Sequence, residues 1–153
     1  MTLPIRANIR KKFGIRPDGR TETPAITESN LEKRFAKEFL DPLKLEYVHQ
    51  WEAKGIGRWY DYYIPEAKLL IEVDGDYWHG FGLTEGEMGP IQIKAKQADM
   101  AKELWAMEHG IALIRFWEHD INNNSKKVMK LLKSALGKDI LNEHINKNKK
   151  KRR

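Results

Sequence analysis

The spacing of apolar residues predicts a domain that alternates helices and strands. Leu31, Phe35 and Phe39 recur every fourth position between residues 29 and 40, which predicts an amphipathic helix. Short apolar or aromatic runs predict four strands, Tyr47 to Trp51, Trp59 to Ile64, Leu69 to Val73 and Ile111 to Trp117. A long helix is predicted for Ile91 to His109, and its apolar side consists of Ala98, Ala101, Leu104, Trp105 and Met107. Another helix begins with Ser125 as its cap, and its inward-facing residues are Val128, Leu131, Leu132 and Leu136. A weaker helical pattern covers residues 138–146.

The predicted order is therefore helix–strand–strand–strand–helix–strand–helix. The long helix connects the third and fourth strands as a crossover, so these two strands should run parallel. The first three strands should form an antiparallel meander, with a tight turn at residues 65–68. The fold class is α/β, with a mixed central sheet flanked by helices. Residues 80–90 contain four glycines and a proline and are expected to form a loop.

Charge divides the chain of 153 residues into an acidic middle and two basic ends. The net charge is +5 over residues 1–20, −8 over residues 21–125 and +9 over residues 126–153. We expect a basic arm (1–26), a core (27–121), C-terminal helices (122–146) and a basic tail (147–153). Basic ends favour a polyanion such as nucleic acid, although lysine-rich tails can also serve solubility alone. The candidate DNA contacts in the basic ends are Arg10, Lys11, Lys12, Lys149, Lys150, Lys151, Arg152 and Arg153. Lys94 and Lys96, on the long predicted helix of the acidic middle, are further candidates, and like Lys102 on that helix they either reach phosphates or are simply solvated.

Two absences restrict the classes of function. The chain has no cysteine, which excludes disulfide scaffolds and Cys-ligated zinc sites. Its apolar runs are too short to span a membrane. We therefore expect a cytoplasmic protein without a membrane partner.

The hairpin between residues 59 and 74 brings acidic residues together. If residues 65–68 form a four-residue loop, Ile64 pairs with Leu69 and Asp61 lies opposite Glu72. Asp74 follows Glu72 by two residues and so shares its side of the sheet. Clustered carboxylates favour a bound hard cation such as Mg²⁺. Three alternatives stay open: a register slipped by one residue, ordinary exposed acids, and a glycosidase-type acid pair, which the basic ends disfavour.

Several neighbouring residues permit both a structural and a functional interpretation. His79 follows the acidic turn and is either a surface residue or a proton acceptor beside a metal. Tyr77 and Trp78 either pack on a helix or stack on bases. Glu32 belongs to the capping box Ser29-Asn30-Leu31-Glu32, and Asp99 lies on a charged helix face.

These segments together resemble a known nuclease family. The residues concerned are Asp61 to Ile64, Leu69 to His79, Asp99 and Ile114 to Glu118, within roughly residues 28–120. They resemble the very-short-patch-repair (Vsr) endonucleases and the related EDxHD homing endonucleases of phages and introns. Both belong to the P-D…(D/E)-x-K superfamily, whose restriction-endonuclease-like core is αβββαβ. The resemblance implies Asp61 as principal metal ligand, the Val73 carbonyl as a further ligand, His79 as general base, and Glu32 and Asp99 as supporting residues.

The chain also departs from the family pattern. It lacks the Cys/His zinc site of the Vsr enzymes, so no zinc is expected. Glu72 supplies a second carboxylate ligand, and Asp74 stands where the superfamily has lysine. The implied activity is Mg²⁺-dependent (or Mn²⁺-dependent) hydrolysis of double-stranded DNA by a phage or intron homing endonuclease. The sequence leaves both a monomer and a homodimer open. A repair or restriction nickase and an inactive DNA-binding module are the alternatives.

Overall fold

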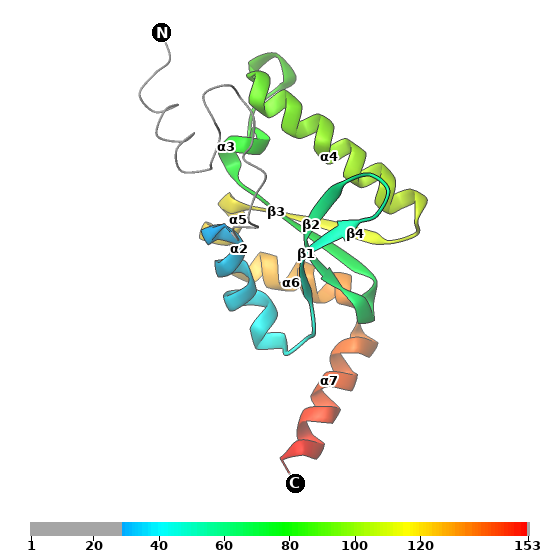
Figure 1. Cartoon of the computed structure of the whole chain (residues 1–153). Helices are drawn as coiled ribbons and strands as arrows, with labels where there is room; N and C mark the ends of the chain where they lie inside the picture. Colours follow the sequence, from blue (N-terminus) through cyan, green and yellow to red (C-terminus); the bar gives the residue numbers. More distant parts are fainter. Residues whose placement is uncertain (1–28, 153) are drawn as a thin grey trace.

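The computed structural model describes residues 29–152, which contain a four-stranded mixed sheet covered by helices on both faces (Figure 1). The strands are β1 (Val48–Ala53), β2 (Arg58–Ile64), β3 (Leu69–Asp74) and β4 (Ala112–Trp117), and they follow this order across the sheet. β2 pairs antiparallel with β1 and with β3, whereas β4 runs parallel to β3. The predicted meander, crossover and α/β class are confirmed. The predicted arm at residues 1–26, with Arg10, Lys11 and Lys12, and the terminal Arg153 lie outside the described residues.

The helices of the described chain are α2 (Asn30–Phe35), α3 (Asp76–His79), α4 (Pro90–Glu108), α5 (Glu118–Asn123), α6 (Ser125–Leu136) and α7 (Lys138–Lys151). A π-helical turn, η1 (Ala36–Leu40), and a 3₁₀ turn, η2 (Asp41–Leu43), continue α2, and two further 3₁₀ turns are η3 (Pro65–Ala67) and η4 (Glu85–Glu87). The short helices α3 and α5 were not predicted, because one or two turns show no periodicity. α7 continues into the predicted tail. None of the described helices is long and apolar enough to cross a membrane.

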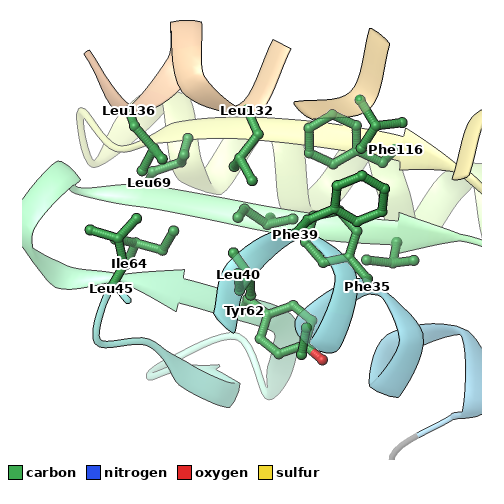
Figure 2. Close-up of a cluster of buried hydrophobic side chains, with 14 of the residues drawn as sticks. Phe35, Phe39, Leu40, Leu45, Tyr62, Ile64, Leu69, Phe116, Leu132 and Leu136 are labelled. Carbon is green, nitrogen blue, oxygen red and sulfur yellow. The ribbon is translucent and has the colours of Figure 1, made fainter. Parts of the chain in front are cut away.

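One face of the sheet packs against α2, η1 and α6 in the main hydrophobic core. Phe35 from α2 lies at its centre, with its ring 5.3 Å from that of Phe116 and 5.2 Å from that of Phe39 (Figure 2). Leu132 from α6 is fully buried beside them. The period of the apolar residues thus positions α2 and α6 under the strands, as the sequence indicates.

The opposite face packs against α4 in a smaller core. Trp105 and Ala106 of α4 contact Tyr60 of β2 and Leu70 of β3, and the Tyr60 hydroxyl donates to the Lys102 carbonyl at 2.6 Å. These contacts fix α4 beside the acidic residues of β3.

Two sequence predictions about helix faces and one about a helix cap were wrong. Leu104 and Met107 were assigned to the apolar side of α4 together with Trp105, yet they are 49% and 72% exposed, because the face that contacts the sheet is that of Trp105 and Ala106. Leu131 of α6 was expected to face inward and is 43% exposed, because Val128, Leu132 and Leu136 already fill the contact with the sheet. Ser125 was expected to cap α6, but it is the first helical residue, and the N-cap Asn124 makes no side-chain cap bond.

The two adjacent leucines of α6 provide a test of the core. Leu132→Ala should lower the free energy of unfolding by about 2–5 kcal/mol, because it leaves a cavity among fully buried residues. Leu131→Ala should change it by only about 0.5 kcal/mol, as is usual for surface positions. Urea unfolding of both variants measures the difference. Equal losses in the two variants would show that α6 does not pack in this orientation.

Candidate active site

β3 carries two carboxylates into the interior of the sheet. Glu72 and Asp74 are only 3% and 2% exposed, and both lie on the side of the sheet that α4 covers. Their charges are met by Lys102, whose Nζ lies 2.8 Å from Glu72 Oε2, and by Arg115, whose Nη1 lies 3.1 Å from Asp74 Oδ1. The prediction that Glu72 and Asp74 lie on the same side of the sheet is therefore confirmed.

Asp61 lies beside Glu72 at an irregular position of β2. The register Ile64–Leu69, Tyr63–Leu70 and Tyr62–Ile71 is the predicted one, but the backbone pairing is not continued to Asp61. Hydrogen bonds between backbone amides and carboxylate side chains take the place of the missing backbone pairing. The Asp61 amide donates to Glu72 Oε1 at 3.0 Å, and the Val73 amide donates to Asp61 Oδ2 at 2.7 Å.

The irregularity extends to the other neighbour of β2. The pairing of β1 with β2 also skips Asp61 and Gln50, and Gln50 has a left-handed φ of 51°. Tyr60 and Tyr62 consequently point to opposite faces, toward α4 and α2 respectively, whereas alternate residues of a regular strand share a face. At this irregular position of β2, the Asp61 carboxylate faces the backbone of β3, where it accepts a hydrogen bond from the Val73 amide.

Burial and mutual repulsion act on these carboxylates. Burial, followed by the charges of Glu72 and Glu32, raises the pKa of Asp61 well above its ordinary value. Burial also raises the pKa of Glu72, although Lys102 and Arg115 oppose this effect. Burial likewise raises the pKa of Asp74, although the charges of His79 and Arg115 act to lower it. Burial is thus the main reason that each carboxylate favours its neutral form, and at Asp61 the charges of Glu72 and Glu32 add to it.

His79 is held between two aspartates. It ends the short helix α3, and its Nδ1 makes a 2.6 Å hydrogen bond with Asp99 Oδ2 of α4. Its Nε2 lies 3.6 Å from Asp74 Oδ1, which is beyond a hydrogen bond. Burial lowers the pKa of His79, but the bond to Asp99 and the charge of Asp74 together outweigh burial, and the net pKa is raised.

The structure thus contains two groups of candidate metal ligands. The predicted pair Asp61 and Glu72 is brought together. At Val73 the contact seen is made by its amide, so the ligand role of its carbonyl stays a prediction. A second group was not predicted as a unit: Asp74, His79 and Asp99 have potential ligand atoms that all lie within 4.8 Å of one another.

Glu32 forms the predicted capping box, while its supporting role in a metal site stays a prediction. In the capping box, Ser29 Oγ accepts from the Glu32 amide at 3.1 Å. The Glu32 carboxylate reaches β1, where its Oε2 lies 2.7 Å from His49 Nε2 and accepts a hydrogen bond from Gln50 Nε2 at 2.9 Å. Because its charge also acts on Asp61, Glu32 belongs to the rim of the acidic cluster.

Arg115 and Lys102 are the site residues that the sequence analysis did not assign to the site. Arg115 Nη1 lies 3.3 Å from Asp99 Oδ1 as well as 3.1 Å from Asp74, and its Nε lies 3.0 Å from Glu103. Lys102 follows Asp99 by one helical turn, a spacing that places both on the same face of α4 and could have indicated its position. Arg115 depends on the register of β4 against β3, which pairs it with Glu72.

The candidate DNA contacts lie around this site and on α7. Tyr77 is 43% exposed at the start of α3, and its ring packs edge-on against Trp78 at 5.6 Å. Lys94 is exposed on α4, whereas Lys96 forms an ion pair with Glu85. Lys149, Lys150, Lys151 and Arg152 are exposed at the end of α7, which projects away from the sheet (Figure 1).

No protein-family model matches this sequence, and no curated protein matches it either. The function is therefore inferred from the residues and their geometry.

The raised carboxylate pKa values predict an unusual dependence of stability on pH. A group whose pKa is higher in the folded chain contributes stability at low pH, and this contribution is lost as the pH rises through the raised value. Asp61, Glu72, Asp74 and His79 all act in this direction. Without added metal, the melting temperature should be higher at a pH near 5.5 than at a pH near 8, by about 3–6 °C.

Asp61→Asn is the matched control for this measurement. It should raise the melting temperature at the higher pH, because it removes repulsion, and it should flatten the pH dependence without abolishing the contribution of His79. A pH dependence identical in wild type and Asp61→Asn would show that Asp61 does not hold its proton more tightly in the folded state.

Proposed function

We propose that this chain is a divalent-metal-dependent DNA endonuclease with a restriction-endonuclease-like αβββαβ core of the Vsr-like, EDxHD type. The observation that carries the proposal is an imidazole, His79, that Asp99 orients at the edge of a buried carboxylate cluster. An oriented base beside acids that attract a cation is the combination that metal-assisted phosphodiester hydrolysis requires.

The residues present fit a hard divalent ion. Glu72, Asp74 and Asp99 pair with the permanent cations Lys102 and Arg115, and the charges of Asp61 and Glu32 act on one another beside them. Oxygen ligands with an imidazole nearby suit Mg²⁺ or Mn²⁺.

Asp61 is the favoured principal ligand, with Glu72 beside it. The triple of Asp74, His79 and Asp99 already has Arg115 Nη1 within 3.1–3.3 Å of both aspartates. In the described chain, by contrast, Asp61 forms no salt bridge with a Lys, Arg or His, and burial raises its pKa well above the usual range. An additional cation therefore gains most at Asp61. When bound, the ion would polarise a phosphate oxygen and make a neighbouring water more acidic.

His79 is the proposed proton acceptor. An ionised carboxylate can only accept, so the bond to Asp99 places a proton on Nδ1 and leaves the lone pair of the neutral ring on Nε2. The raised pKa makes this nitrogen a stronger base. Asp99 is a positioning residue, since it fixes the tautomer and the orientation of the ring.

DNA binding is assigned to aromatic and basic side chains. Tyr77 and Trp78 lie in the same short helix as His79 and could stack on bases close to the reacting phosphate. The lysines at the end of α7, together with the basic residues 1–20 of the sequence, would bind the flanking phosphates. A homing endonuclease is the favoured biological role, and a repair or restriction nickase uses the same site.

Cleavage of supercoiled plasmid in the presence and absence of Mg²⁺ tests this proposal. Wild type should produce nicked or linear DNA only with the metal. His79→Ala should slow cleavage by roughly 10²–10⁴-fold, which is the usual contribution of a general base, and Asp61→Asn should slow it at least as much. Both variants should retain DNA binding in a gel-shift assay, because neither removes a basic side chain that is proposed to contact phosphate.

His144→Ala is the matched control. His144 also pairs with a carboxylate, Glu66, at 2.8 Å, but on α7 and away from the acidic cluster. Its loss should leave the cleavage rate unchanged. Wild-type protein that binds DNA without cutting it under any divalent metal would instead support the inactive binding module.

A further inference from the structure

α4 presents an apolar stripe on the face that it turns away from the sheet. Ile93, Met100, Leu104 and Met107 are 43%, 60%, 49% and 72% exposed. α4 lies along the outside of the molecule (Figure 1). Solvent-facing helix surfaces usually carry polar and charged residues, so four large apolar side chains on one outer face indicate a contact with a partner.

The spacing of these residues is that of a coiled-coil seam. Together with the exposed Gln97 they occupy positions 93, 97, 100, 104 and 107, with alternating steps of four and three residues. Beside the last of them lies an open groove of about 460 Å³ between α4 and the edge strand β4. Met107, Ala106, Ile111 and Leu113 supply its apolar lining, so the apolar surface continues from the seam into the groove.

The charges that flank the seam are distributed unequally along the helix. Lys94 and Lys96 flank its N-terminal half, whereas Glu103 and Glu108 flank its C-terminal half. Lys94 and Glu108 are exposed, and neither forms an ion pair within residues 29–152. A second α4 in antiparallel orientation would bring each lysine end against a glutamate end. A parallel orientation would place like charges together, which is unfavourable.

We propose that two copies of the chain associate through their α4 helices as an antiparallel coiled-coil pair. Met100 of one copy lies opposite Leu104 of the other, Gln97 opposite Met107, and Lys94 beside Glu108. The seam is self-complementary, as a two-fold interface requires. This inference does not depend on DNA cleavage, because the seam and the acidic cluster use different faces of α4.

The expected dimer is reversible. α4 has 19 residues and is therefore about 28 Å long. One helix pair of this length, even with the adjoining groove, buries less than the roughly 1,600 Å² of a standard stable interface. The association should consequently vary with protein concentration in the micromolar range.

Sedimentation equilibrium of the full chain tests the proposal. The mass of the wild type should rise from one chain toward two as the concentration increases, and Leu104→Glu should weaken the association at least tenfold. Ile56→Glu is the control, since Ile56 is 40% exposed between β1 and β2 and lies outside the seam. A wild type that stays monomeric, or equal effects of the two substitutions, would overturn the proposal.

The orientation is tested by exchanging charges. Lys94→Glu and Glu108→Lys should each weaken association about tenfold, because each creates two like-charged pairs per dimer, and the double variant should restore it. Circular dichroism establishes that each variant is folded. A double variant that associates no better than the single ones would exclude the antiparallel pair.

Discussion

Every element around the candidate site depends on the neutralisation of two acids inside a sheet. Glu72 and Asp74 lie on β3, which is buried along its whole length. An unpaired buried charge costs several kcal/mol, so the sheet requires cations at this place. Arg115 from β4 and Lys102 from α4 supply them. The same ion pairs therefore link β4 and α4 to β3, and α4 in turn carries Asp99, which contacts His79.

The cations pair with some of these carboxylates and not with others. This difference is what makes the cluster a candidate metal site. Arg115 is shared by Asp74 and Asp99, whereas Asp61 forms no salt bridge within residues 29–152, is repelled by Glu72 and feels only the opposing charge of Lys102. A cluster that served stability alone would have little reason to retain the repelled carboxylate, since an uncharged residue of the same shape would relieve the repulsion. α4 connects this cluster with the outer seam, so a dimer would hold two such clusters in a fixed relation.

The sequence predicts those features that depend on local pattern and turn length. The turn at residues 65–68 sets the hairpin register, and this register brings Asp61 next to Glu72. The contacts of Arg115 could not be predicted in this way, because the register between β3 and β4 is set by the packing of the whole crossover. The outward orientation of Leu104 was missed because α4 has apolar residues on two faces, and periodicity does not say which face the sheet covers.

The central claim is that the uncompensated charge at Asp61 forms a divalent-metal site, and calorimetric titration of Mn²⁺ into the DNA-free protein tests it most directly. Wild type should bind the ion, and Asp61→Asn should bind it roughly tenfold or more weakly, since the loss of a charged ligand is worth about 1.4 kcal/mol or more. Asp99→Asn should retain most of the affinity, because Arg115 already lies against Asp99. Unchanged binding in Asp61→Asn, with the loss in Asp99→Asn instead, would place the ion among Asp74, His79 and Asp99 and contradict the claim.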